Sequence, residues 1–99
     1  MIVVAGHFTV PADKQRAFAD AAKELTAETL QEDGCLFYEF WADLDGSGRF
    51  SVLEAWETEE HLDAHLRTPH LAAFRAKRAE IGMQDESINR YVVSEVKPI

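Results

Sequence analysis

Two neighbouring runs in the middle of the chain have the composition of β-strands, and a segment typical of a turn separates them. Residues 35–42 (CLFYEFWA) and 49–57 (RFSVLEAWE) are rich in aromatic and β-branched side chains, which favour extended backbone. Residues 43–48 contain Asp, Gly and Ser, which are common in turns. The pattern predicts an antiparallel hairpin, which limits how the flanking segments can be arranged.

The register of this hairpin decides which of its side chains share a face. Pairing centred on Gly46 places Tyr38 opposite Glu54 and Phe40 opposite Val52. Because side chains alternate along a strand, one face then carries Tyr38, Phe40, Val52, Glu54 and Trp56. A shift of one residue would move this set to the other face.

A strand followed by a helix is expected before the hairpin. Residues 2–10 are rich in β-branched side chains and end at Pro11, which cannot continue a ladder of hydrogen bonds. Residues 13–32 carry apolar side chains at helical spacing. We expect Asp13 to cap this helix and Asp33-Gly34 to end it.

A broken helix and a last strand are expected after the hairpin. Thr58 is a suitable cap for a short helix, and Thr68-Pro69 is a suitable start for a second one that ends at Gly82. Residues 88–97 (INRYVVSEVK) form the predicted last strand, which Pro98 ends.

The resulting order, strand-helix-strand-strand-helix-strand, predicts an α+β fold of the split β-α-β type. It contains an antiparallel four-stranded sheet with helices on one face. The chain has 99 residues, so we expect a single domain over 1–99, too small to bury most of its apolar surface alone. Apolar residues occur at both inward and outward strand positions, such as Val3 and Val4. We therefore expect a homodimer in which the open sheet faces of two copies pack together.

The charge and hydropathy of the chain argue against several classes of partner. The chain has 10 basic and 18 acidic residues and a formal charge of −8, which repels nucleic acid and anionic membranes. No apolar run approaches the length of a membrane span, and the first ten residues do not resemble a signal peptide. We expect a cytoplasmic protein. Cys35, the one cysteine, can form no internal disulfide and is expected to be an inert packed residue.

Three of the four histidines follow the hairpin. His61 and His65 are four residues apart, as two metal ligands on a helix would be, but the Glu of a zinc-protease motif is absent, so we expect no metal. His65 shares the inward side with Leu62, where it is either a packed histidine or a pocket base, and His61 is expected nearer the surface. His70 falls in the first turn of its helix, where a cation is disfavoured, so it could accept a proton if buried.

Four further residues are candidates for the same site. His7 interrupts an apolar strand where folding does not require an imidazole, so it is a second candidate for a pocket residue. Trp56 is expected to be both a core residue and a pocket wall. Arg75 is equally compatible with a surface ion pair and with holding a phenolate. Glu54 is expected either to pair with an arginine or to orient a histidine.

The sequence Trp56-Glu57, followed by HLDAHLRTPHLAAF at 61–74, resembles the antibiotic biosynthesis monooxygenase (ABM) family. The resemblance covers essentially the whole chain and is closest to the small quinol monooxygenase and autoinducer-processing branches. It implies a ferredoxin-like protomer and a dimeric α+β barrel. It also implies, in many members, oxidation of a phenol or quinol by O₂ without metal, flavin or haem.

Two branches of this family can be compared residue by residue. The pocket tryptophan and the helical arginine of the polyketide-oxidising branch fall on Trp56 and Arg75, but its asparagine and tyrosine fall on Val52 and Leu62. The haem-degrading branch needs an asparagine, a tryptophan and a haem-binding histidine, where this chain has His7, His65 and Arg75. Haem degradation is not expected, because arginine cannot ligate iron.

The leading hypothesis is a cofactor-independent monooxygenase that acts on a small phenol or quinol with O₂. A histidine, His65 or His7, would remove a phenolic proton, and Arg75 and the Trp56 N–H would stabilise the oxyanion. The substrate-binding residues would be Tyr38, Phe40, Val52, Glu54, Leu62, His70 and Phe74. Two alternatives remain: an isomerase or carbonyl-processing enzyme of the same fold that acts on a small polar metabolite, and a non-catalytic dimeric module that binds a small molecule.

Overall fold

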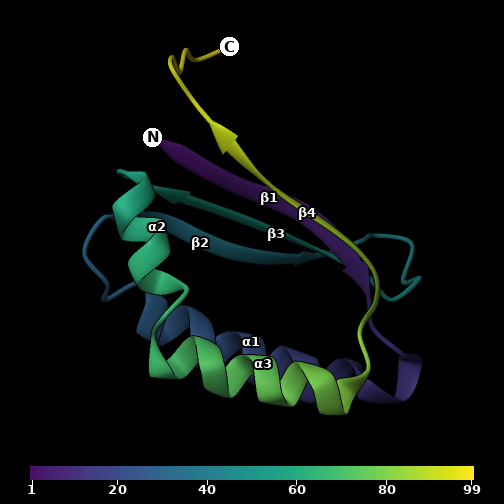
Figure 1. Ribbon diagram of the computed structural model, residues 1–99. Coiled ribbons are helices and arrows are strands. Elements are labelled where there is room, and N and C mark those ends of the chain that lie inside the picture. Colours follow the sequence, from purple (N-terminus) through teal and green to yellow (C-terminus); the bar gives the residue numbers. More distant parts are fainter.

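The computed structural model describes residues 1–99 and has two layers, a sheet and a layer of helices against one of its faces (Figure 1). The strands are β1 (Ile2–Thr9), β2 (Cys35–Ala42), β3 (Arg49–Trp56) and β4 (Gln84–Val92). The helices are the 3₁₀ turn η1 (Ala12–Lys14), α1 (Gln15–Thr29), α2 (Glu59–His65) and α3 (Pro69–Ile81). The sheet has the order β2-β3-β1-β4 with antiparallel pairing throughout, which confirms the predicted α+β, ferredoxin-like fold.

The predicted register of the central hairpin is confirmed. Tyr38 pairs with Glu54 and Phe40 with Val52. The side chains of this face point toward the helices, and Tyr38, Val52, Glu54 and Trp56 are buried there. The hairpin therefore forms one wall of the space between the two layers.

The predicted starts of α2 and α3 are also confirmed, and so is the end of α3. The Thr58 side chain accepts a hydrogen bond from the backbone N–H of His61, and the Thr68 side chain accepts one from Leu71. Gly82 follows α3 in the left-handed conformation, with φ of 79°. These caps fix the point at which the chain bends between α2 and α3, and hence the position of the histidines on either side of the bend.

Two predicted elements have different bounds in the structure. The first helix is preceded by the 3₁₀ turn and ends at Thr29, and Asp13 lies inside that turn, where its side chain caps neither element. The last strand begins at Gln84 rather than at residue 88 and ends at Val92 rather than at residue 97. The first residues of β4 are polar and still pair with β1. An edge strand needs few apolar side chains, because the hydrogen bonds of its backbone hold it in the sheet.

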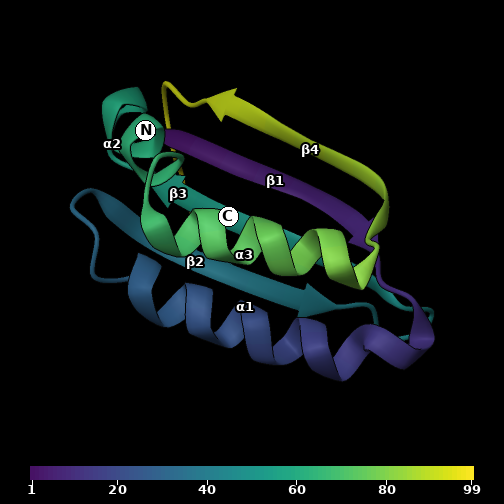
Figure 2. The same ribbon diagram turned by 60° about the horizontal axis from the view of Figure 1, so that its bottom comes forward.

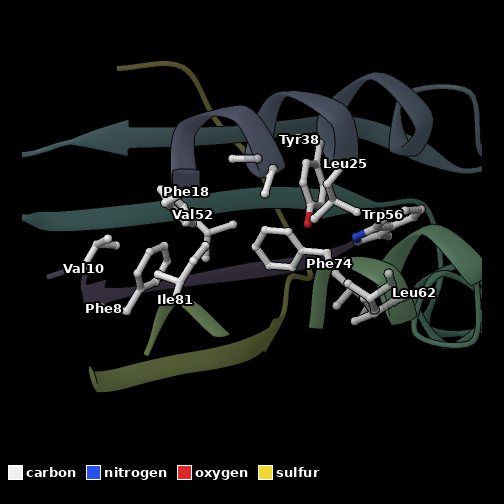
Figure 3. Packing of buried hydrophobic residues seen from close by; sticks show 14 residues of the cluster. Phe8, Val10, Phe18, Leu25, Tyr38, Val52, Trp56, Leu62, Phe74 and Ile81 are labelled. Carbon is white, nitrogen blue, oxygen red and sulfur yellow. The ribbon is translucent and has the colours of Figure 1, made fainter. Parts of the chain in front are cut away.

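The core lies between the sheet and the helices α1 and α3, which run side by side under it (Figures 1 and 2). Phe8 of β1 and Phe18 of α1 meet edge to face, with ring centroids 5.2 Å apart. Figure 3 shows Phe74 of α3 and Leu62 of α2 on the side of the core that faces Tyr38 and Trp56. The buried polar side chains Glu54 and His65 lie at this end of the core, against Trp56.

The opposite face of the sheet carries no helix (Figure 1). The residues that border a shallow depression on this face include Ala5, His7, Ser51, Leu53 and Tyr91. Several large apolar side chains are exposed in this single chain, Trp41 and Tyr91 among them. None of the helices combines the length and the apolarity that crossing a membrane requires.

Candidate functional site

A cavity of about 300 Å³ lies between the sheet and the helices α2 and α3. Its lining includes these predicted site residues: Tyr38, Phe40, Val52, Glu54, Leu62, His65, Phe74 and Arg75. The contribution of β4 to this lining, including Ile88 and Arg90, was not predicted, because the sequence does not show beside which strand the last strand lies. The strand pairing with β1 brings β4 to this position.

His65 is the buried imidazole of this cavity. It lies in the last turn of α2 and is 1% exposed. Its Nδ1 atom is 2.7 Å from Oε2 of Glu32. No hydrogen bond engages its Nε2 atom. This atom is not fully buried, because the single fully buried side-chain polar atom without a partner is Oγ1 of Thr29. The Nε2 atom is therefore accessible from the cavity.

The surroundings of His65 favour the neutral imidazole. Burial lowers the pKa of His65, the charges of His70 and Arg75 act in the same direction, and the hydrogen bond and negative charge of Glu32 oppose them in part. A neutral imidazole that donates from Nδ1 to a carboxylate presents the lone pair of Nε2 to the cavity. This arrangement is that of a general base.

Glu32 was not predicted as a site residue. It follows α1 in the turn before β2, and its Oε2 atom also lies 2.7 Å from Nε2 of His70. His70 was expected to bind the substrate, but it does not line the cavity; it contacts the site through Glu32. No local sequence pattern marks Glu32, because its partners lie more than thirty residues away in the chain.

Trp56 is placed behind the cavity rather than on its wall. Its side chain is fully buried, and its ring centroid is 4.7 Å from that of His65. Its Nε1–H donates to Oε1 of Glu54 at 2.8 Å, so the expectation that this N–H stabilises an oxyanion is wrong. Glu54 pairs with no arginine and orients no histidine, in contrast to both alternatives from the sequence.

Two side chains of the cavity have raised pKa values. Burial raises the pKa of Glu54 to about 7, against a lowering by its hydrogen bond from Trp56. Burial, and then the negative charges of Glu54 and Glu32, raises the pKa of Tyr38 above its ordinary value, so the phenol keeps its proton and can donate it. The cavity thus contains a neutral base, a carboxyl group that titrates near neutral pH and a hydroxyl donor.

Arg75 supplies positive charge at the cavity without a carboxylate partner. It lies on α3, borders the cavity and takes part in no ion pair, which rules out the surface ion pair considered from the sequence. The other arginines of the lining are paired: Arg78 with Glu86, and Arg90 with Glu59 and Asp63. An anion in the cavity would therefore meet Arg75 as its available cation.

His7 is not part of this cavity. It pairs with Ser51 and borders the depression on the helix-free face of the sheet, because its neighbours Gly6 and Phe8 are the residues that face the helices. The expectation that His7 and His65 could serve one site is wrong within a single chain. His61 packs over Gly34 and is hydrogen-bonded to Thr58, also outside the cavity.

Glu32, His65 and His70 form the group of side chains that could hold a metal ion, with their ligand atoms within 4.8 Å of one another. Two of the separations are 2.7 Å, a hydrogen-bond distance. Ligands of a tetrahedral zinc ion with bonds of about 2.0–2.1 Å lie about 3.3 Å apart. The group has the geometry of hydrogen-bonded side chains.

The fold and the site define a small α+β protein with a base and a free cation at an apolar cavity. The family model "Antibiotic biosynthesis monooxygenase" (ABM) matches residues 1–77, and the chain belongs to this family. It is similar to the "Probable quinol monooxygenase YgiN" of Escherichia coli strain K12, with 31% identity over 83 residues, which cover 75% of this chain and 80% of that protein.

Solved structures agree with this assignment. A protein described as a "putative antibiotic biosynthesis monooxygenase" from Deinococcus radiodurans superposes with a TM-score of 0.93 and 25% identity, over 100% of this chain and 98% of that one. A conserved protein from Methanosarcina mazei Go1 superposes with a TM-score of 0.83 and 32% identity, over 91% of this chain and 89% of that one. The resemblance seen in the sequence is thus confirmed at the level of family and fold.

Proposed function

We propose that this protein is a monooxygenase that oxidises a small phenol or quinol with O₂ and uses no metal, flavin or haem. The family supports an oxidation, and the relative named as a quinol monooxygenase supports this class of substrate. The observation that carries the proposal is His65, a neutral imidazole whose free Nε2 atom borders a cavity that Arg75 also borders.

The reaction begins with the transfer of a phenolic proton to Nε2 of His65. The resulting phenolate gives an electron to O₂ far more readily than the phenol does. Arg75 stabilises the negative oxygen, because it has no carboxylate partner in the resting protein. The Tyr38 hydroxyl, which keeps its proton, is a second donor to that oxygen.

The substrate supplies all the electrons of the reaction. For a hydroquinone, one atom of O₂ forms a new C–O bond to the ring, and the O–O bond then breaks. The second atom leaves as water with two hydrogens from the substrate, and the product is a hydroxyquinone. Phe40, Val52, Leu62 and Phe74 surround this chemistry with apolar surface, which strengthens the polar contacts and keeps water from a peroxy intermediate.

Oxygen uptake tests the proposal. The protein is dialysed against EDTA, and consumption of O₂ is followed with an electrode across a panel of hydroquinones and phenols. We expect uptake with at least one quinol, and we expect His65→Gln to lower kcat/KM by about 100-fold or more.

His61→Asn is the matched control, because His61 lies on the same helix outside the cavity, and it should retain the activity of the wild type. Activity that disappears with EDTA and returns with a metal ion would contradict the absence of a metal. No uptake across the panel would contradict the oxidation itself.

The second candidate is an isomerase or carbonyl-processing enzyme, and one observation favours it. Glu54, with a pKa of about 7, and the neutral His65 border the same cavity, as a proton-transferring pair would. Such an enzyme needs no O₂, so equal turnover of a substrate under argon and under air would select it. A ligand that binds without turnover in either atmosphere would indicate a non-catalytic binding module.

A further inference from the structure

We propose that Glu32 and His70 are positioning residues for His65: the Glu32 carboxylate holds the proton of His65 on Nδ1, and His70, itself held by Glu28, fixes the carboxylate. The inference rests on the proposed function, in which His65 is the base. It assigns roles to side chains that lie outside the cavity and contact no substrate.

The contact between Glu32 and His65 determines which nitrogen of His65 carries the proton. A neutral imidazole has one N–H, and a carboxylate only accepts hydrogen bonds. At 2.7 Å from Oε2 of Glu32, Nδ1 of His65 must therefore carry the proton. The Nε2 atom that borders the cavity is then the one with a lone pair, which is the form that can take a proton from a phenol.

A positive charge appears on His65 during the proposed reaction. When Nε2 takes the substrate proton, His65 becomes an imidazolium ion in a site that is 1% exposed. Burying that charge is costly unless an opposite charge lies close to it. The Glu32 carboxylate, whose side chain is 14% exposed, lies in direct contact with the ring and stabilises the cation.

The Glu32 side chain is held in place by His70. Glu32 lies in a turn rather than in a helix or strand, so its backbone alone does not fix its side chain. Nε2 of His70 lies 2.7 Å from the same Oε2 atom, and Nδ1 of His70 lies 3.1 Å from Oε2 of Glu28 on α1, so the ring carries a proton on each nitrogen when it donates to both carboxylates. The Glu32 carboxylate is thereby held between His65 at the end of α2 and His70 in the first turn of α3.

The exposed fractions of these side chains follow the order of the chain of contacts. They rise from 2% at His65 to 14% at Glu32, 18% at His70 and 63% at Glu28. The negative charge of Glu28 is at the surface, where it costs little, and the charge that matters for the base is the partly shielded one at Glu32. The further charged or titratable groups that face His65 are Arg75 on α3, Glu54 on β3 and Tyr38 on β2.

The first test reads the position of the proton on His65 and does not depend on activity. Long-range ¹H–¹⁵N NMR spectra of the neutral ring distinguish the two tautomers. We expect the Nδ1–H form of His65 in the wild type and a loss of this preference in Glu32→Ala. An Nε2–H form in the wild type would overturn the proposal, whether or not the protein oxidises quinols.

The second test uses oxygen uptake. Glu32→Gln keeps the size of the side chain but removes its charge, so kcat should fall about 100-fold. The acid limb of the pH profile of kcat/KM should also move to lower pH, because Glu32 raises the pKa of His65. A merely structural role for Glu32 would lower the rate without moving this limb, and that result would overturn the proposal.

Two variants of His70 separate its hydrogen bond from its bulk. His70→Leu removes the donor to Glu32 and should lower kcat about tenfold. His70→Gln keeps a donor and should recover most of that loss. Glu24→Gln is the matched control for the loss of a carboxylate near this site. Glu24 lies one helical turn from Glu28 but pairs with Lys77 instead, so the rate and the pH profile of this variant should match those of the wild type.

Equal losses in both His70 variants would overturn the role assigned to His70. If EDTA abolished activity and a divalent ion restored it only while Glu32 and His70 were intact, the same three side chains would be metal ligands, and this too would overturn the proposal. If no quinol is oxidised at all, the proposed function fails, and the tautomer measurement still decides the contact between Glu32 and His65.

Discussion

At the scale of single residues, Glu54 places an ionisable group in the core, where its residue is 6% exposed. Its pKa is about 7 in the folded protein and 4.5 for the free side chain. Between these values the folded protein holds a proton that the unfolded chain has released. The free energy of unfolding therefore decreases as the pH rises through this range, and the full cost of the buried charge is reached above about pH 7.

Glu54→Gln should remove this cost. The amide has the shape of the protonated carboxyl group and can still accept the hydrogen bond from Trp56. We expect the variant to be more stable than the wild type by about 3 kcal/mol at about pH 8, since each pKa unit corresponds to about 1.4 kcal/mol, and by little at about pH 5. Urea unfolding at both pH values measures the difference.

The wild type is the reference at each pH, so the titration of His65 and the other groups cancels from this comparison. A variant that is no more stable than the wild type at about pH 8 would show that Glu54 titrates in its ordinary range. Turnover by the same variant separates the two proposed functions. A proton-transferring pair needs Glu54, so the variant would lose turnover of its substrate under argon, whereas the proposed oxidation needs only His65 as a base, so oxygen uptake with a quinol would be retained.

At the scale of elements, the close approach of β1 and β4 determines the shape of the cavity. Gly6 pairs with Ile88, and a Cβ atom at Gly6 would lie 2.2 Å from the carbonyl oxygen of Ser87 and 2.5 Å from Cα of Ile88. Both atoms belong to the backbone, so a side chain at Gly6 can fit only if β4 moves. Ile88 is also a residue of the cavity lining.

Gly6→Ala should therefore destabilise the protein by about 1–3 kcal/mol and loosen β4 in particular. Thermal unfolding measures the first effect, and hydrogen exchange of the backbone amides of β4 measures the second. The amides of the β2–β3 hairpin serve as the internal control, because they do not pair with β4. Unchanged protection of β4 would contradict the close approach seen between the two strands.

At the scale of the whole molecule, we propose that the helix-free face of the sheet packs against the same face of a second copy. The support is its composition: Leu53 lies on this face with Trp41 and Tyr91, which are 59% and 51% exposed in the single chain. Apolar side chains of this size on the open face of a sheet favour association. A two-fold arrangement would bury both faces at once.

Sedimentation equilibrium tests this arrangement. We expect the wild type to be a dimer and Leu53→Glu to be a folded monomer, because the charge would be buried at the centre of the contact. Leu44→Glu is the matched control, since Leu44 is fully exposed in the turn between β2 and β3, outside this face, and should leave the dimer intact. A monomeric wild type, or an equal effect of both substitutions, would contradict the proposal.

Local signals in the sequence were sufficient for the elements and for much of their arrangement. Caps such as Thr58 and Thr68, the turn around Gly46 and the alternation along the hairpin depend on residues close to one another in the chain, and the structure confirms them. Where the local signal was weak, the prediction was wrong: Asp13 had no helix end to cap, and the polar start of β4 resembled a loop.

Tertiary structure alone decided the contacts of the site. Both faces of the first strand carry apolar residues, so alternation could not show that His7 points away from the helices. The hydrogen bond from Trp56 to Glu54 depends on both side chains being enclosed by the same layers. Glu32 meets His65 because the end of α1 and the end of α2 pack at one corner, and a contact between residues so far apart in the chain leaves no periodic pattern in the sequence.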